Sequence, residues 1–165
     1  MSDARLERVI HLLEATSGQD LWFGGATVMG SLRGVPWETA AWKPAPDRHS
    51  IWELVLHIAY WKYSVTRNLT GVPHGSFPRS PANFPRVPSP ANAAAWEKDR
   101  RLLKDQHAEL CAGVRAFDPA KLDEPVPEKP KWSWLDLLDG IVMHDTYHTG
   151  QIQLMKRLHR SLQQG

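Results

Sequence analysis

Apolar side chains recur at helical spacing in four stretches of the sequence, and no stretch alternates in the manner of a β strand. The four stretches run over residues 4–16, 50–69, 90–117 and 133–159. Apolar residues repeated every three or four positions form one face of an amphipathic helix, and that face must be buried against other helices. The sequence therefore predicts an all-α fold, a four-helix bundle.

Local signals indicate where two of these helices begin and where one ends. Ser50 with Glu53, and Ser133 with Asp136, have the spacing of a capping box, in which the two side chains satisfy backbone N–H groups at a helix start. Gly71 follows the second stretch, and glycine is the residue that most often ends a helix. The second helix is therefore expected to begin at Ser50, run to about Leu69 and stop at Thr70-Gly71, and the fourth is expected to start at Ser133.

The connections between the expected helices are long and rich in proline and glycine. Segment 18–48 holds five glycines and three prolines, and prolines recur through 72–89 and 125–130. Ser89 and Pro90 have the residue types that favour an N-cap and the first helical position, so we expect them to open the third helix. Long connections in a compact domain tend to be functional, and segment 72–89 is a candidate lid.

Composition narrows the classes of protein to consider. A chain of 165 residues fits a single domain spanning residues 1–165. Acidic and basic residues are interspersed, with a net charge of +2, so no nucleic-acid partner is expected. No apolar run reaches the roughly 18 residues of a membrane span, and the N-terminus lacks the apolar core of an export signal. The single cysteine, Cys111, excludes an internal disulfide and fits a reducing compartment, so we expect a cytoplasmic protein without a membrane partner.

Three histidines are the candidate functional residues. His144 and His148 stand four residues apart in the expected fourth helix. Side chains at that spacing lie one above the other, with Cβ atoms about 5–6 Å apart, so both can reach one metal ion. The H-E-x-x-H zinc helices use the same geometry, although their glutamate is missing here. His57, on or beside the apolar face of the second helix, is the candidate third ligand.

A metal ion would explain why imidazoles occupy apolar helix faces. A buried polar group without a partner costs about 1–3 kcal/mol, and one divalent cation can satisfy three imidazoles at once. Three protein ligands leave one position open, which is typical of catalytic rather than structural zinc. Imidazole also suits nickel and iron, so the residues leave Zn, Ni and Fe open. A purely structural role for the three histidines is the competing interpretation.

Residues near the histidines have two interpretations each. Glu53 could support a ligand or act as a general base, or it could serve only as the capping partner of Ser50. Gln151 could orient a ligand or substrate, or be a surface amide. Asp145 and Tyr147 are expected to point about 100° away from the neighbouring histidines and are weaker candidates. No residue is assigned as catalytic.

The sequence resembles the DinB/YfiT-like superfamily of small four-helix bundles. The resemblance lies in residues 50–59, SIWELVLHIA, and 144–152, HDTYHTGQI, and the layout between them makes it extend over nearly the whole chain. It implies that His57, His144 and His148 bind a divalent metal ion. It also implies a thiol-dependent S-transferase or isomerase that uses a low-molecular-weight thiol such as bacillithiol, mycothiol or glutathione.

Two functions are therefore open. The first is a metal-dependent enzyme that transfers a thiol to a small electrophilic substrate. The alternative is a non-catalytic, metal-binding, stress-associated bundle that acts as a homodimer or through a partner protein. A lid over the histidines would favour the enzyme, and an apolar patch on the outer helix faces would favour dimerisation.

Overall fold

The computed structural model describes residues 3–17, 25–71 and 75–164, and the described residues form six α helices, one 3-10 helix and one pair of strands. The four long helices are α1 (Ala4–Ser17), α4 (Ile51–Thr70), α5 (Ala93–Ala116) and α6 (Trp134–Gln163). The shorter elements are α2 (Val28–Ser31), α3 (Trp37–Ala41), η1 (Pro119–Lys121), β1 (Pro125–Val126) and β2 (Lys129–Ser133). The all-α prediction is confirmed.

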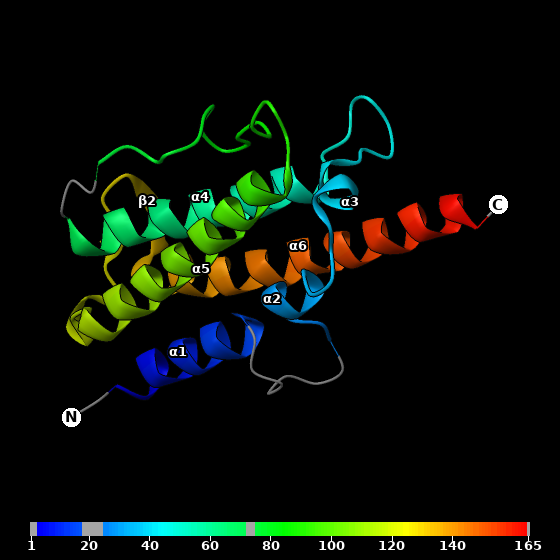
Figure 1. Cartoon of the computed structure of the whole chain (residues 1–165). Helices are drawn as coiled ribbons and strands as arrows, with labels where there is room; N and C mark the ends of the chain where they lie inside the picture. Colours follow the sequence, from blue (N-terminus) through cyan, green and yellow to red (C-terminus); the bar gives the residue numbers. More distant parts are fainter. Residues whose placement is uncertain (1–2, 18–24, 72–74, 165) are drawn as a thin grey trace.

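The four long helices pack in a closed ring, in which α4 and α1 each contact both α5 and α6. Figure 1 shows α1 and α6 running in one direction and α4 and α5 in the other. Because α4 and α5 run the same way, the chain between them must return along the bundle. Its described part, residues 75–92, lies over α4 in Figure 1 and is called the crossover loop below. Among the described helices, none combines the length and hydropathy that crossing a bilayer requires.

The apolar core has two parts, and the turns of α6 that carry His144 and His148 lie between them. One cluster, around Trp52, joins α2 and α3 to the first half of α4, to α5 and to the second half of α6. The other, around Leu138, joins α1 and the strands to the opposite ends of the long helices. Along α6, the residues of the second cluster end at Val142 and those of the first cluster begin at Ile152. His144 and His148 therefore lie between the two clusters, whereas His57 lies on α4 among residues of the first cluster.

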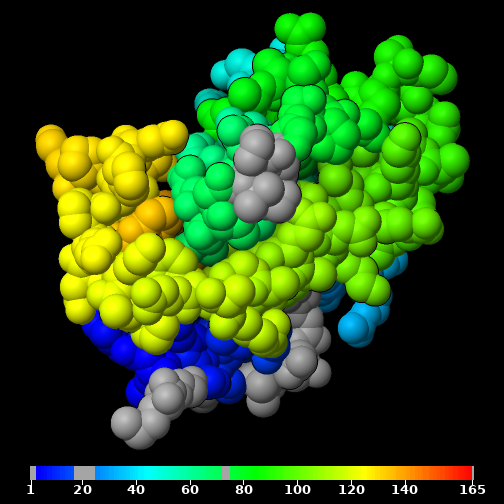
Figure 2. Space-filling view, turned by 90° about the vertical axis from the view of Figure 1, so that its left-hand side faces the viewer, coloured from blue at the N-terminus to red at the C-terminus, as the bar shows by residue number. Residues whose placement is uncertain are grey.

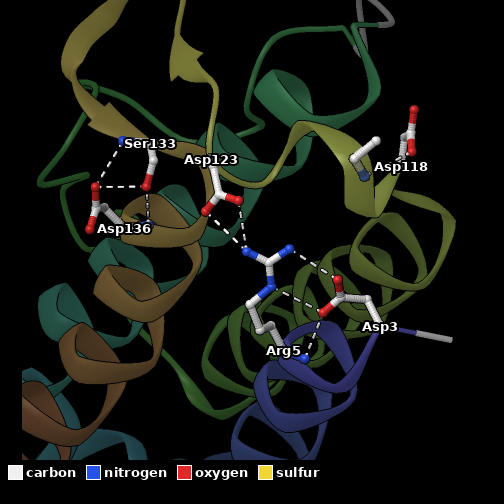
Figure 3. A network of polar contacts seen from close by, with 7 residues as sticks. Asp3, Arg5, Asp118, Asp123, Ser133 and Asp136 are labelled. Atoms are coloured by element: carbon white, nitrogen blue, oxygen red, sulfur yellow. Dashed lines mark hydrogen bonds and ion pairs between the residues drawn. The ribbon is translucent and has the colours of Figure 1, made fainter.

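Both predicted capping boxes are present. The Ser50 hydroxyl accepts the Glu53 N–H, and the Glu53 carboxylate accepts the Ser50 N–H. Ser133 and Asp136 make the same exchange at the start of α6, as Figure 3 shows. Gly71 follows α4 with a φ of 61°, a left-handed conformation that glycine adopts without steric cost. These signals are local, and the structure agrees with them.

Figure 3 also shows how α1 is fastened to the segment that precedes the strands. The Arg5 guanidinium lies between the carboxylates of Asp3 and Asp123, with N–O distances of 3.0 and 2.9 Å. Asp118 caps η1 nearby by accepting the Ala120 N–H. These contacts are close to solvent, so each contributes little to stability.

Two predicted helix boundaries are wrong. Helix α5 begins at Ala93 instead of after Ser89, because Asn92 caps it by accepting the Ala95 N–H and the alanines that follow are the strongest helix formers. Helix α6 continues to Gln163, past the predicted end.

Residues 125–133, expected to be a loop, contain the antiparallel strands β1 and β2. Two residues in β1 are too few for alternation to show in the sequence. Figure 2 views this end of the molecule, where the strands stand beside α4. A hollow of about 300 Å³ opens there between the end of α4 and the strands. The predictions for residues 18–24 and 72–74 lie outside the described residues.

Candidate metal centre

The structure brings His57 of α4 together with His144 and His148 of α6. The Nε2 atom of His144 lies 3.0 Å from Nε2 of His57 and 3.1 Å from Nε2 of His148. Ligand nitrogens bound to one ion at about 2.0–2.1 Å are roughly 3–3.4 Å from each other. The three side chains could therefore hold a metal ion, at a spacing that needs little adjustment.

Two of the histidines are hydrogen bonded through the ring nitrogen that faces away from the cluster. Nδ1 of His57 lies 2.6 Å from the carbonyl oxygen of Asn83, and Nδ1 of His148 lies 2.6 Å from Oε1 of Gln151. Carbonyl oxygens only accept hydrogen bonds, so each Nδ1 carries the ring hydrogen. Each Nε2 then presents a lone pair to the centre of the cluster, as a metal ligand must.

His144 cannot satisfy both of these lone pairs. One hydrogen on its Nε2 can point along only one of the two short contacts, so at least one lone pair remains opposed to a ring nitrogen that offers it no hydrogen. Its Nδ1 atom is buried and has no hydrogen-bond partner among the described residues. A cation between the three Nε2 atoms removes the opposition, so the donor set fits a metal ion better than a network of hydrogen bonds.

Burial keeps the cluster uncharged near neutral pH. It lowers the pKa of His57 to about 4 and the pKa of His144 to about 3. Burial also lowers the pKa of His148. Neutral imidazole is the form that binds metal ions, so the site needs no deprotonation step to accept one.

We expect the metal-free protein to lose stability as pH falls from about 6.5 to about 4. Unfolded histidine titrates near 6.5, whereas the folded pKa of His57 is about 4. The unfolded state therefore binds more protons in this window, and each unit of depression corresponds to about 1.4 kcal/mol. Urea denaturation of chelator-treated protein measures the effect. Replacing His57, His144 and His148 together with glutamine should weaken the dependence, of which the partly buried His107, whose pKa burial lowers to about 3, retains a part. A wild-type midpoint that stays constant would contradict the prediction.

The crossover loop covers one side of the cluster. The Phe84 ring is stacked between His49 and His57, with centroid distances of 3.9 Å to each. The Asn83 side chain accepts a hydrogen bond from Nε1 of Trp61 at 2.9 Å, while its carbonyl binds His57. Asn83 has a φ of 69°, a left-handed conformation that asparagine tolerates better than most residues. The described part of the predicted lid therefore covers the histidines.

A buried ion pair anchors the loop to the bundle. The Arg79 guanidinium lies 2.6 Å from the carboxylate of Asp99 in α5, a residue with no exposed surface. The other carboxylate oxygen of Asp99 accepts a hydrogen bond from Nε1 of Trp52 at 2.8 Å. The loop that orients His57 is thereby tied to both α4 and α5. Trp52 is a core residue and does not line the histidine cluster.

The structure decides between the two interpretations of the neighbouring residues. Glu53 is the capping partner of Ser50 and also pairs with Lys43 at 2.8 Å, so its carboxylate is held at the helix start. Gln151 is the hydrogen-bond partner of His148 and thus orients a candidate ligand. Tyr147 is exposed, and its hydroxyl accepts a hydrogen bond from Gln151.

Lys62 is a residue near the site that sequence reasoning missed, and its partner is Asp145, which the sequence suggested only as a weaker candidate. They form an ion pair between α4 and α6, and their side chains are 1% and 0% exposed. Burial raises the pKa of Asp145, which lies next to His144 in the chain and faces the interior. Lys62 follows Ile58 by one helical turn on the apolar face of α4. A charged residue on an apolar helix face was the sequence signal that could have identified Lys62.

Two cavities adjoin the cluster. One, of about 200 Å³, is bordered by His144, and the other, of about 500 Å³, by His148. Trp61 lines the first and Phe84 the second. A small molecule can therefore approach the histidines from either side.

Comparison with known proteins agrees with this geometry. The family model described as the DinB superfamily matches residues 25–152, most of the chain and all three histidines. No curated protein and no solved structure matches the chain.

Proposed function

The chain belongs to the DinB superfamily, and on that premise we propose that it is a metal-dependent enzyme that binds one divalent ion through His57, His144 and His148. The observation that carries the proposal is the convergence of three Nε2 atoms, in which that of His144 lies 3.0 Å from that of His57 and 3.1 Å from that of His148. Zn, Ni and Fe all accept imidazole ligands. The two adjoining cavities support a site that substrates can reach.

The reaction we propose is transfer of a low-molecular-weight thiol to a small electrophile. The thiol sulfur forms a bond to an electrophilic carbon, the bond from that carbon to the leaving group breaks with its electron pair, and the thiol proton is released. A bound divalent cation would lower the pKa of a coordinated thiol, so that the thiolate is available near neutral pH. Bacillithiol, mycothiol and glutathione are candidate cosubstrates.

The chain's own residues orient the ligands and limit water at the site. The Asn83 carbonyl and the Gln151 side chain hold the rings of His57 and His148 in the ligating tautomer. Phe84 and Trp61 cover ring faces and edges of the cluster. Cys111 supplies no nucleophile, because it is buried in α5 and burial raises the pKa of its thiol. The nucleophilic sulfur therefore comes from the cosubstrate.

An assay of metal-loaded protein with each thiol and a chlorodinitrobenzene tests the proposal. We expect thioether formation above the uncatalysed rate, detected by absorbance and mass spectrometry. His148→Ala should abolish the added rate, whereas His11→Ala, at an exposed histidine of α1, should retain it. If the protein binds metal but no thiol accelerates the reaction, the thiol-transfer proposal is wrong.

A second candidate function is a metal-binding bundle that acts as a homodimer without turnover. A stripe of exposed apolar residues along the outer face of α6 favours it. The stripe consists of Met143, Tyr147, Leu154, Leu158 and Leu162. Such a face is typical of a protein–protein contact. A light-scattering mass of one chain, together with thiol-dependent turnover, would reject this candidate.

A further inference from the structure

The cavity beside His144 is a pocket with one cation at its edge. It lies between α4, α6 and β2, and its volume is about 200 Å³, enough for a benzene-sized ring. Its lining is apolar except for one histidine and one lysine. The lining residues are Trp61, Val65, Lys129, Trp132, Leu137, Gly140, Ile141 and His144.

Two tryptophans and a lysine form the outer part of this pocket. The Lys129 ammonium lies 5.1 Å from the ring centroid of Trp61 and 5.1 Å from that of Trp132. Both distances are those of a cation–π contact. Among the described residues, no carboxylate forms an ion pair with Lys129. The ammonium is therefore placed at an apolar pocket with its charge unneutralised by a carboxylate.

Two further features leave the pocket available to a ligand. Trp132 on β2 is 47% exposed, so its indole forms a wall without being part of either apolar cluster. Gly140 of α6 presents open space, because a Cβ added there would meet nothing within 4 Å. Open space therefore lies over the α6 backbone at Gly140, in a pocket that the two indoles also line. Aromatic pairs attract each other beyond the effect of the area they bury.

We propose that this pocket binds small molecules that join an aromatic or apolar body to a carboxylate, with the carboxylate paired to Lys129 and the body held by Trp61 and Trp132. Such a molecule would be the electrophilic substrate, and only this last step rests on the proposed function. The charge at the edge decides the ligand class, since a cationic ligand would meet the Lys129 ammonium and an anionic ligand would neutralise it. The pocket would thus select substrates by charge beside the candidate metal centre.

Three probes of equal body and different charge test this inference. Phenylpropionate is anionic, phenylpropionamide neutral and phenylpropylamine cationic. Isothermal titration calorimetry on the metal-free protein should show phenylpropionate binding about tenfold more tightly than the amide, which is about 1.4 kcal/mol, and the amine binding most weakly. Lys129→Met should remove the advantage of the anion, and Lys129→Glu should transfer it to the amine. Lys131→Met, at an exposed lysine outside the pocket, should leave it unchanged.

Equal affinities for the three probes, absence of binding, or the same result for Lys129→Met and Lys131→Met would overturn the inference. The titration is made without metal, so its outcome is separate from that of the proposed function. Charge-selective binding by a protein that takes up no metal would reject the metalloenzyme and leave the pocket. Metal uptake without charge-selective binding would reject the pocket and leave the metal centre.

Discussion

Replacing Lys62 with methionine should lower the free energy of unfolding by roughly 3–5 kcal/mol, because the Asp145 carboxylate would be left buried without its counter-ion. Urea denaturation of metal-free protein at neutral pH measures this loss. The deficit should shrink as the pH falls. Burial already raises the pKa of Asp145, and the protonated carboxyl carries no charge that needs a partner.

Two further variants show whether the loss comes from the unpaired charge. Lys62→Met combined with Asp145→Leu should recover most of the stability, since apolar residues of similar volume often replace a buried ion pair at little cost. Lys98→Met, at an exposed position of α5, should change stability by no more than about 0.5 kcal/mol. If Lys62→Met alone were equally mild, the interior could not contain the charged pair described here.

Replacing His148 with alanine should weaken metal binding far more than replacing its partner Gln151. The loss of His148 removes one of three ligand nitrogens, whereas the loss of Gln151 removes only the hydrogen bond that orients it. Partners of metal ligands typically account for about 10–100-fold in affinity, and we expect Gln151→Ala to fall in that range. Competition with a chromogenic chelator measures both affinities.

The relative loss of metal affinity in the two variants distinguishes a metal ligand from a residue that only orients the ligand. His11→Ala, at an exposed histidine, provides the matched control and should bind metal as the wild type does. Equal affinities for His148→Ala and His11→Ala would show that the metal ion binds elsewhere. Equal losses for Gln151→Ala and His148→Ala would show that the amide is itself a ligand.

Local signals in the sequence were sufficient for the helices and for two of the three histidines. The apolar periodicity located α1, α4, α5 and α6 because each helix buries one face. His144 and His148 could be paired because helix geometry alone places them together. The start of α5 was misplaced because Ser89 and Asn92 are both good caps, and the choice between them depends on the path of the crossover loop.

The remaining parts of the site depend on tertiary contacts. The Asn83 carbonyl reaches His57 only because the crossover loop returns over α4, and no residue pattern specifies that path. Lys62 meets Asp145 only because α4 and α6 are neighbours in the helix ring. Helical spacing predicted that Asp145 would point away from His144, which is correct, but that direction is inward. Helix geometry predicts the direction of the Asp145 side chain, but it does not predict which residues of other helices lie in that direction.

The central claim is that one divalent ion binds to the three histidines, and elemental analysis tests it most directly. Wild-type protein and the double variant His144→Ala with His148→Ala are each loaded with Zn, Ni or Fe, freed of excess metal and analysed. We predict about one equivalent in the wild type and none in the double variant, as expected for a three-ligand site. No metal in either protein, or equal amounts in both, would contradict the claim.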